Sequence, residues 1–394
     1  MIFSTLLLCV GFVSSLTIHL NTVTNTPVTY DVEVGSYLYV ASTDMSVLLQ
    51  NIIITDGTPY TAYTFSKLGV NSEGTMTAYV ITTNKITIQG NQAYDYSMTT
   101  GYIYITTANQ AKDPHFLVYP ADVSSLISTN YKNATLVFLN YDIDIPRKYD
   151  YIPLKSARIT KLSNSPFKIY WNEPTPNWNN GSDFFRQLVF MNPLQGMYYE
   201  NIDPIQMNTY IWYIRAYDGI TLSVEPTWID PNTIISSGYN SSGMIMSTHN
   251  IQNISFALAK DSNYGGESGY RCIFKVESVT TISLGDPFPT IMSPTNLTDL
   301  NVRYIVRGAP SDYFSIQSAS PSVGVFAIQY FQQQGDKMTT PLATSTSIPT
   351  TINGGTTQKT PATTTSSSSS TYFLLTFAGI FFYFVNNLNT HHEL

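Results

Sequence analysis

The feature that most constrains this chain is a long series of short runs of β-branched and aromatic residues, each closed by turn residues. Turns such as Asp56-Gly57 and Gly90-Asn91 separate the runs, several of which show the alternation of a half-buried strand. No long window places apolar residues at helical spacing. The pattern predicts an all-β fold of antiparallel β-sandwiches. The predicted strands cover residues 36–42, 45–54, 77–88, 101–107, 116–119, 167–171, 186–191, 209–217, 251–259, 270–276, 302–306 and 323–330.

The composition agrees with an exported β protein and argues against a nucleic-acid partner. Aromatic residues make up 13 % of the chain and charged residues only 11 %, against about 25 % in ordinary soluble domains. The formal net charge is −7. Because nucleic-acid binding is dominated by lysine and arginine contacts to phosphate, this acidic balance indicates a different class of partner.

The first fifteen residues have the pattern of a secretory signal peptide. An apolar core covers residues 6–13, and Val13 and Ser15 occupy the −3 and −1 positions of a small-residue cleavage site. The alternative is a buried N-terminal strand. We favour a cleaved signal, because a second membrane-targeting pattern stands at the other end of the chain.

The C-terminal residues have the pattern of a lipid-attachment signal. A Thr/Ser/Pro-rich stretch, residues 336–353, cannot bury a core and predicts an O-glycosylated stalk. Small residues from Asn353, a polar spacer and a 14-residue apolar block (372–385) follow. A membrane-spanning helix needs about 20 apolar residues, so we expect a GPI signal over 354–394, with the lipid on Asn353. Ala362 is an alternative attachment residue, and a short transmembrane helix or a fully secreted product are alternative outcomes.

Five asparagines fit the acceptor pattern for N-linked glycans, and none has proline in the middle position. In a chain with a signal peptide, such sequons mark exposed loops or strand edges. The predicted acceptors are Asn133, Asn180, Asn240, Asn253 and Asn296.

Only one of the two cysteines remains once the signal peptide is removed. Cys9 lies in the signal core, which leaves Cys272 without a partner in the same chain. Cys272 is either a nucleophile, half of an intermolecular bridge, or a small buried apolar residue. Alternation along 270–276 puts it on the face of Tyr270, Phe274 and Val276, so we favour the buried role.

Two tryptophans are candidate ligand contacts. Trp171 directly precedes a loop rich in asparagine and proline, and Trp178 lies within it. An exposed tryptophan there would stack on a sugar or anchor a partner. The alternative is that both indoles cap the core of the sandwich.

Short segments resemble CUB domains. Residues 51–57 (NIIITDG) with 65–69 (FSKLG) are similar to the middle of a CUB domain, and 261–263 with 266–270 and 273–276 are similar to its closing strand. The plan of the chain resembles the nematode CUB-like secreted proteins over 16–122 and 165–277. The chain departs from true CUB domains by lacking their paired cysteines. The resemblance implies tandem CUB-like jelly-roll sandwiches with extracellular binding or defence-related roles.

The resulting organisation has two β-sandwich domains and additional β structure. We expect a signal peptide (1–15), a first CUB-like sandwich (16–125), a linker (126–164), a second CUB-like sandwich (165–277), an additional β segment (278–335), the stalk (336–353) and the removed GPI signal (354–394).

The sequence favours a non-enzymatic recognition or adhesion protein displayed on the extracellular face of the plasma membrane. His19, His115 and His249 lie far apart, and no nucleophile elbow or phosphate loop occurs. We therefore predict no catalytic, metal-binding or cofactor-binding residues. The expected partners are an extracellular glycan or protein and the membrane through the lipid. The alternatives are a passive surface-coat glycoprotein and a secreted glycan-acting enzyme.

Overall fold

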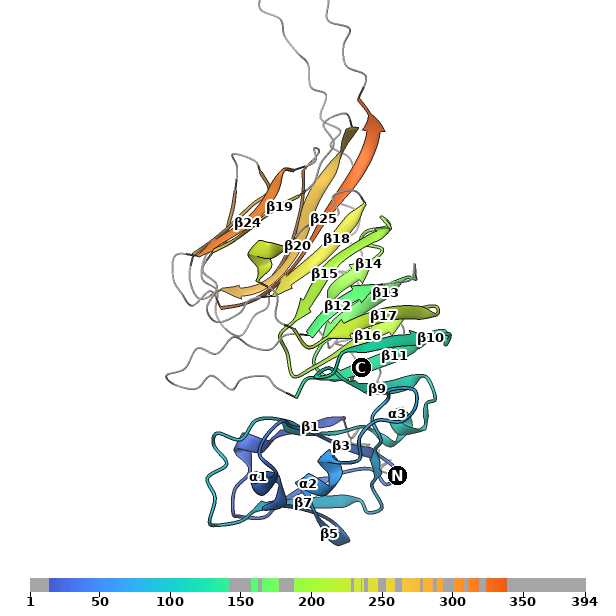
Figure 1. Cartoon of the computed structure of the whole chain (residues 1–394), viewed down its shortest axis with the longest axis vertical. Coiled ribbons are helices and arrows are strands. Elements are labelled where there is room, and N and C mark those ends of the chain that lie inside the picture. The colour runs from blue at the N-terminus through green and yellow to red at the C-terminus, as the bar shows by residue number, and fades with distance from the viewer. Residues whose placement is uncertain are drawn as a thin grey trace, which may run out of the picture. The chain divides into compact units, whose positions relative to one another are not determined.

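The computed structural model is built almost entirely of β-strands (Figure 1). It describes residues 14–141 without a break. Further along, it describes residues 157–161, 165–176, 188–227, 230–234, 236, 240–246, 253–258, 264–276, 279–285, 289–292, 301–307, 311–318 and 324–338.

The first part of the chain forms a sandwich of two four-stranded sheets. Sheet 1 has the order β2 (Val28–Asp31), β7 (Lys85–Gly90), β4 (Ile52–Asp56) and β5 (Thr58–Thr61). Sheet 2 has the order β1 (Leu16–His19), β8 (Tyr102–Ile105), β3 (Tyr37–Ala41) and β6 (Tyr79–Val80). Three short helices connect them: η1 (Leu20–Thr22), α1 (Ser46–Gln50) and α2 (Ala62–Ser66). A fourth, α3 (Ala108–Lys112), follows β8 and leads to the next sheet.

The described strands that follow form three more sheets. Sheet 3 has the order β14 (Leu188–Asn192), β13 (Phe167–Trp171), β16 (Ile211–Ala216), β11 (Ala134–Leu139) and β9 (Phe116–Pro120). Sheet 4 has the order β10 (Ser125–Thr129), β17 (Ile220–Glu225), β12 (Ala157–Lys161), β15 (Asn201–Met207), β18 (Ser241–Met246), β25 (Gly324–Lys337), β20 (Tyr264–Val276) and β23 (Asn301–Arg307). Sheet 5 has the order β19 (Asn253–Ala257), β24 (Tyr313–Ser318), β21 (Thr280–Ser283) and β22 (Thr290–Met292), and η2 (Pro231–Thr233) precedes β19 in the chain.

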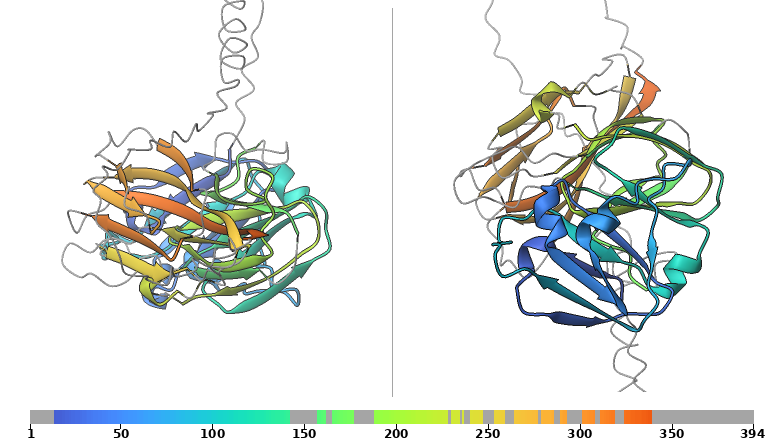
Figure 2. Two further views of the ribbon diagram at one scale, coloured as in Figure 1. Left: turned by 90° about the horizontal axis from the view of Figure 1, so that it is seen from above. Right: turned by 60° about the horizontal axis from the view of Figure 1, so that its bottom comes forward.

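Most of these strand pairs are antiparallel. Among the described strands, the pairs β9–β11 and β15–β18 are parallel. The two further views in Figure 2 show the same layered strands from above and from below. The all-β fold predicted from the sequence is confirmed, and the tandem jelly-roll arrangement stays a prediction.

Successive sheets pack face to face, so that sheets 2, 3 and 4 bury side chains on both of their faces. In β8, Ile103 and Ile105 enter the core between sheets 1 and 2. The alternate residues, Tyr102 and Tyr104, enter a tyrosine-rich core between sheets 2 and 3. Because successive side chains of a strand point to opposite faces, one strand serves two cores.

The same division holds on the far side of sheet 3. In β11, Val137 and Leu139 face the tyrosine-rich core, whereas Leu136 and Phe138 face the core between sheets 3 and 4. Among the described residues, four cores therefore lie between the five sheets, and a smaller cluster gathers around Leu194, Tyr199 and Phe331. This burial explains the apolar and aromatic richness of the strands. A strand buried on both faces reads as an almost continuous apolar run.

Sheet 4 is shared by two sandwiches. In β20, Ile273 enters the core with sheet 3, while Cys272 enters the core with sheet 5. Strand β25, from the segment predicted as additional β structure, pairs with both β18 and β20. That segment is thus an integral part of the eight-stranded sheet.

The segment predicted as a linker, 126–164, also contains paired strands. It holds β11 and β12, and all of β10 except Ser125. Strand β11 pairs with β9 on one side and β16 on the other. These pairings tie the segment into sheets 3 and 4, and the division of the chain into separate domains stays a prediction.

The two Asp-Gly turns, one in each of the segments that resemble CUB domains, have different local structures. Gly57, at a φ of 70°, closes the tight hairpin between β4 and β5, where Asp56 pairs with Thr58. Asp218-Gly219 instead connects β16 of sheet 3 with β17 of sheet 4. The second turn therefore crosses from one sheet to another and does not close a hairpin.

Candidate functional site

Two cavities open on either side of Met76, where the N-terminal sandwich meets sheet 3. Residues 69–78 leave the N-terminal sandwich and reach β9, the edge strand of sheet 3. The Met76 amide donates to the Val118 carbonyl at 2.8 Å, and the Thr77 amide donates to the Gly69 carbonyl at 3.0 Å. These two hydrogen bonds hold the segment between the two cavities.

The larger cavity has a volume of about 340 Å³. Its walls combine aromatic rings with hydroxyl, amide and carboxylate groups, a mixture typical of small-molecule sites. It is lined by Tyr37, Tyr39, Asn71, Thr75, Met76, Ala78, Val80, Ala111, Asp113, Pro114, Phe116, Leu117 and Val118.

The smaller cavity has a volume of about 240 Å³ and a more apolar lining. Val70 and Val123 line this cavity, and each has more than half of its surface exposed. The Tyr141 hydroxyl lies 3.4 Å from the sulfur of Met76. The cavity is lined by Tyr39, Val40, Phe65, Ser66, Gly69, Val70, Met76, Thr77, Pro120, Asp122, Val123 and Tyr141.

Tyr39 lines both cavities and is the most distinctive residue of the site. Its side chain is 5 % exposed, and its ring stacks on that of Tyr104 with centroids 6.1 Å apart. No residue in the described part of the chain forms a hydrogen bond with its hydroxyl. Burial, with a smaller contribution from Tyr37, raises the pKa of Tyr39 far above its usual range. The hydroxyl therefore stays neutral and can both donate and accept a hydrogen bond.

Asn71 and Asp113 contribute further hydrogen-bonding groups to the larger cavity. The Asn71 side-chain oxygen accepts from the amides of Glu73, at 2.9 Å, and Thr75, at 3.0 Å. The Asn71 amide nitrogen therefore remains as a donor. One Asp113 oxygen accepts from the His115 amide at 2.8 Å. Its other oxygen remains as an acceptor.

The charged residues that line the cavities are both acidic. Asp113 lines the larger cavity and Asp122 the smaller one, and no lysine or arginine of the described chain lines either. Such a surface repels anions at close range and accepts neutral or cationic groups.

The structure places the predicted contact Trp171 in the core. Trp171 is 8 % exposed and belongs to the core between sheets 3 and 4, as the capping alternative expects. Trp178 lies outside the described residues. The described beginning of the loop contacts the N-terminal sandwich: the Pro174 carbonyl accepts from Ser15 Oγ at 2.8 Å and from Gln110 Nε2 at 3.2 Å.

Three of the predicted glycan acceptors lie in the described part of the chain. Asn133 is exposed on the turn before β11 with a φ of 56°, and Asn253 is exposed at the start of β19. Asn240 is half-buried, and its side-chain oxygen accepts from the Gln334 amide at 3.3 Å. Asn180, Asn296 and the predicted lipid-attachment residue Asn353 lie outside the described residues.

Cys272 occupies the buried position that its alternation predicts. It is fully buried in the core between sheets 4 and 5 with Tyr270 and Phe274. Burial raises the pKa of the thiol far above its usual range, outweighing the opposite effect of Arg271 and Arg303. A thiol that stays protonated and out of contact with solvent is a poor nucleophile.

Sequence reasoning did not find the cavity residues. Tyr39 lies in a correctly predicted strand, and Tyr37, Tyr39 and Ala41 alternate there with Leu38 and Val40. This alternation contains a signal, because one face is aromatic and the other aliphatic. The sequence around this strand does not predict that the aromatic face packs against β9 and residues 69–78.

The comparisons with known proteins place the chain in a family. A family model described as a transmembrane glycoprotein matches residues 33–383, which is most of the chain. The chain belongs to this transmembrane glycoprotein family, and it is therefore a surface or membrane-associated glycoprotein. No curated protein gives a significant match.

Two further observations apply to the described residues alone. None of their helices is both long and apolar enough to cross a membrane. Nowhere among them do three or more histidine, cysteine or acidic side chains gather in a way that could hold a metal ion. The apolar block 372–385 lies outside the described residues.

Proposed function

We propose that this protein is a non-enzymatic recognition glycoprotein, displayed on the extracellular face of the plasma membrane by a GPI anchor. The observation that carries the proposal is the double cavity around Met76, open to solvent and lined by hydrogen-bonding groups that are not used within the fold. Membership of a family of transmembrane glycoproteins supports the location.

The two ends of the chain support an exported, lipid-anchored product. Strand β1 begins at Leu16, directly after the cleavage site expected from the sequence. The last described strand, β25, ends at Lys337, where the Thr/Ser/Pro-rich stretch begins. A stalk and a lipid after that point would hold the β-sheets outside the cell.

The exposed acceptors support N-glycosylation of the folded protein. Asn133 is exposed on the turn before β11. Asn253 is exposed at the first position of β19.

The experiment that tests the anchor is phospholipase C treatment of cells that display the full chain. We expect the protein to be released into the medium, and N-glycosidase treatment to lower its apparent mass. The variants Asn353→Gln and Ala362→Gln, made separately, identify the attachment residue, because only one of them should lose surface display. Retention on cells whose inositol ring is unacylated would overturn the GPI anchor and favour a real membrane span over 372–385.

A passive coat glycoprotein is the second candidate function. It is favoured by the family match, whose description names a glycoprotein and no ligand. The two candidates differ in one measurement: a coat protein shows no saturable binding of any small ligand, whereas a recognition protein does.

A further inference from the structure

We propose that the larger cavity beside Met76 binds one neutral sugar residue, with Tyr39 and Asn71 as its specificity-determining contacts. The inference rests on the recognition function proposed above and names the ligand class of that site. It follows from the cavity's charge, from its hydrogen-bonding groups and from its aromatic rings.

The charge of the lining excludes an anionic ligand. Asp113 is the charged residue that lines the larger cavity, and Asp122 lines the neighbouring one. A carboxylate, sulfate or phosphate group placed there would lie close to these carboxylates without a lysine or arginine from the described chain to pair with. Repulsion between like charges at such distances is costly. A neutral or a cationic ligand remains.

The hydrogen-bonding groups favour a neutral, hydroxyl-rich ligand over a cation. A cationic amine only donates hydrogen bonds, so it would use the free oxygen of Asp113 but not the amide nitrogen of the exposed Asn71. A sugar hydroxyl both donates and accepts. It can therefore pair with the amide nitrogen of Asn71, with the second oxygen of Asp113 and with the hydroxyl of Tyr39.

Tyr39 offers the two cavities a hydroxyl that no described residue pairs with. The side chain is 5 % exposed, yet its hydroxyl has no hydrogen-bond partner within the described chain. The hydroxyl is not one of the fully buried, unpaired oxygens of the described chain, so it reaches the open cavities, where water or a ligand can pair with it. Because Tyr39 lines both cavities, a hydroxyl group of a bound sugar is placed to satisfy it.

The aromatic rings supply apolar surface for the C–H face of a sugar ring. Tyr37 and Tyr39 meet edge to face, with centroids 6.5 Å apart and planes at 84°, so the two rings present differently oriented walls. Phe116 adds a third ring from β9. Tyrosine offers large, rigid contact area at low conformational cost, as in other recognition surfaces.

The site is built from both sides of the junction between the N-terminal sandwich and sheet 3. Tyr37 and Tyr39 come from β3, Phe116 comes from β9, and Asn71 comes from the segment 69–78 between the two cavities. The Met76–Val118 hydrogen bond joins these parts. The volume of about 340 Å³ lies at the lower end of the ~300–1,000 Å³ usual for small-molecule sites, which suits one sugar residue.

The test is saturation-transfer NMR on the full chain, purified in detergent and freed of its own N-glycans so that they cannot occupy the cavity. The probes are the methyl glycosides of glucose, galactose, mannose and N-acetylglucosamine. Ethylammonium tests the cationic alternative, and N-acetylneuraminic acid tests the anionic one. We expect saturable binding of at least one neutral glycoside and none of N-acetylneuraminic acid.

Two variants and two matched controls locate the binding. Tyr39→Phe removes only the hydroxyl and should weaken binding roughly three- to tenfold, the usual effect of one lost hydrogen bond. Its control is Tyr104→Phe, which also removes only a hydroxyl. The Tyr104 ring is buried and stacks on Tyr39, but Tyr104 lines neither cavity. Asn71→Asp keeps the oxygen that holds the turn but removes the amide donor. Its control is Asn25→Asp, which places the same charge on another exposed asparagine that lines neither cavity.

Each outcome decides the proposal. Weaker glycoside binding in both cavity variants, with unchanged binding in both controls, supports it. Binding of ethylammonium alone, absence of any neutral glycoside binding, or equal binding by all four variants overturns it. Should Tyr39→Phe fail to fold, Asn71→Asp on the exposed turn still decides. The phospholipase result is independent, so loss of the anchor and loss of the sugar site are distinguishable.

Discussion

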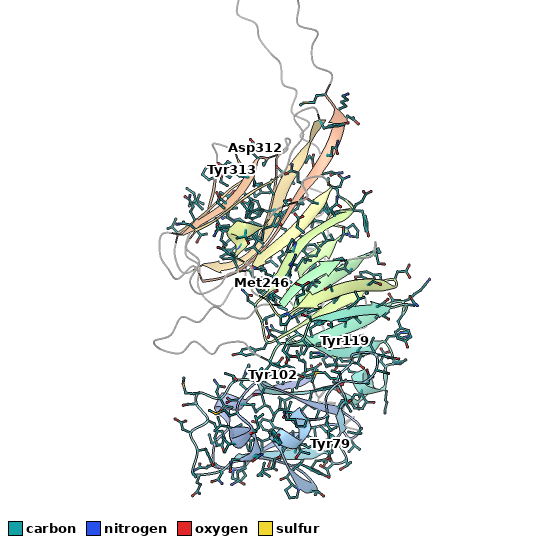
Figure 3. The ribbon with its side chains drawn as sticks, in the orientation of Figure 1. Tyr79, Tyr102, Tyr119, Met246, Asp312 and Tyr313 are labelled. Atoms are coloured by element: carbon teal, nitrogen blue, oxygen red, sulfur yellow. The ribbon has the colours of Figure 1, made fainter. Side chains whose placement is uncertain are left out.

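The hydroxyl of Tyr102 donates a hydrogen bond of 2.5 Å to the main-chain carbonyl of Tyr210. Tyr102 lies in β8 of sheet 2, and Tyr210 directly precedes β16 of sheet 3. Their rings also meet nearly at right angles, with centroids 5.6 Å apart. In Figure 3, Tyr102 is labelled on the N-terminal sandwich, at the face that is turned toward sheet 3, where Tyr119 is labelled. The contact joins the first sandwich to the rest of the described chain across the tyrosine-rich core.

We predict that Tyr102→Phe lowers the free energy of unfolding by about 1 kcal/mol, because the Tyr210 carbonyl loses one of its two donors, keeping the Asn140 amide at 2.9 Å, while the ring packing is kept. Urea unfolding, followed by tryptophan fluorescence, measures the change. The control is Tyr94→Phe, which removes a hydroxyl from a tyrosine that is 37 % exposed and should change stability by less than ~0.5 kcal/mol. Equal stability of Tyr102→Phe and the wild type would contradict the prediction.

The carboxylate of Asp56 accepts several hydrogen bonds from residues 79–83. One carboxylate oxygen accepts from the Thr82 amide at 2.6 Å, the Thr82 hydroxyl at 2.9 Å and the Tyr79 hydroxyl at 3.1 Å. The other accepts from the Thr83 amide at 2.8 Å and from the Thr83 hydroxyl. Burial alone would raise the pKa of Asp56, but these hydrogen bonds outweigh it and lower the pKa below its usual value of 3.8.

We predict that Asp56→Asn destabilises the protein by roughly 2–3 kcal/mol at neutral pH, since a charged acceptor is replaced by a neutral one with a single oxygen. Because the folded pKa is depressed, the contribution of Asp56 is complete above pH 3.8 and is lost as the pH falls through the folded value. The difference between variant and wild type should therefore shrink in acid. Unfolding curves at pH 7 and pH 3 measure it, and a constant difference would contradict the assignment.

The sequence predicts the positions of many strands but not the way in which they pack. The run 167–171 coincides with β13, and 116–119 falls within β9. The run 45–54 predicts one strand, whereas the structure has helix α1 over Ser46–Gln50 and then β4. Short apolar runs do not distinguish a strand from a buried turn of helix, which is the physical reason for this error.

The candidate site was beyond sequence reasoning for a different reason. The face on which Tyr39 lies follows from alternation, but the partner of that face is set by pairing between distant strands. Asn71 and Asp113 lie in turns, and only the fold brings them beside Tyr39. Trp171 and the loop after it had the strongest local signal for binding. The structure shows Trp171 in the core, and the Pro174 carbonyl accepts hydrogen bonds from Ser15 and Gln110.

Cys272 should be unreactive in the native protein. It is fully buried in the core between sheets 4 and 5, and burial raises the pKa of its thiol. We predict that iodoacetamide labels Cys272 only after denaturation, as measured by mass spectrometry of the intact protein. Cys272→Ser should lower the free energy of unfolding by about 1–3 kcal/mol by burying a hydroxyl, whereas Cys272→Ala should cost less. Rapid labelling under native conditions would instead favour a reactive or bridging thiol.

His19 lies at the same junction as Tyr102 and Tyr210. Its ring contacts the Tyr210 ring edge to face at 4.6 Å and lies 6.2 Å from that of Tyr102. Partial burial lowers the pKa of His19 below its usual value of 6.5, although the negative charge of Glu173 acts in the opposite direction. The folded protein thus favours the neutral imidazole, and the unfolded chain binds the proton more readily.

We therefore predict that the contribution of neutral His19 to stability is complete above pH 6.5 and is lost as the pH falls through the lowered folded value. Unfolding free energies measured between pH 7.5 and pH 5 should decrease in the wild type and decrease less in His19→Gln, which cannot take up the proton. The variant Glu173→Gln removes the opposing charge, so it should lower the pKa of His19 further and steepen the decrease. Identical pH profiles for the wild type and His19→Gln would show that the junction does not respond to this histidine.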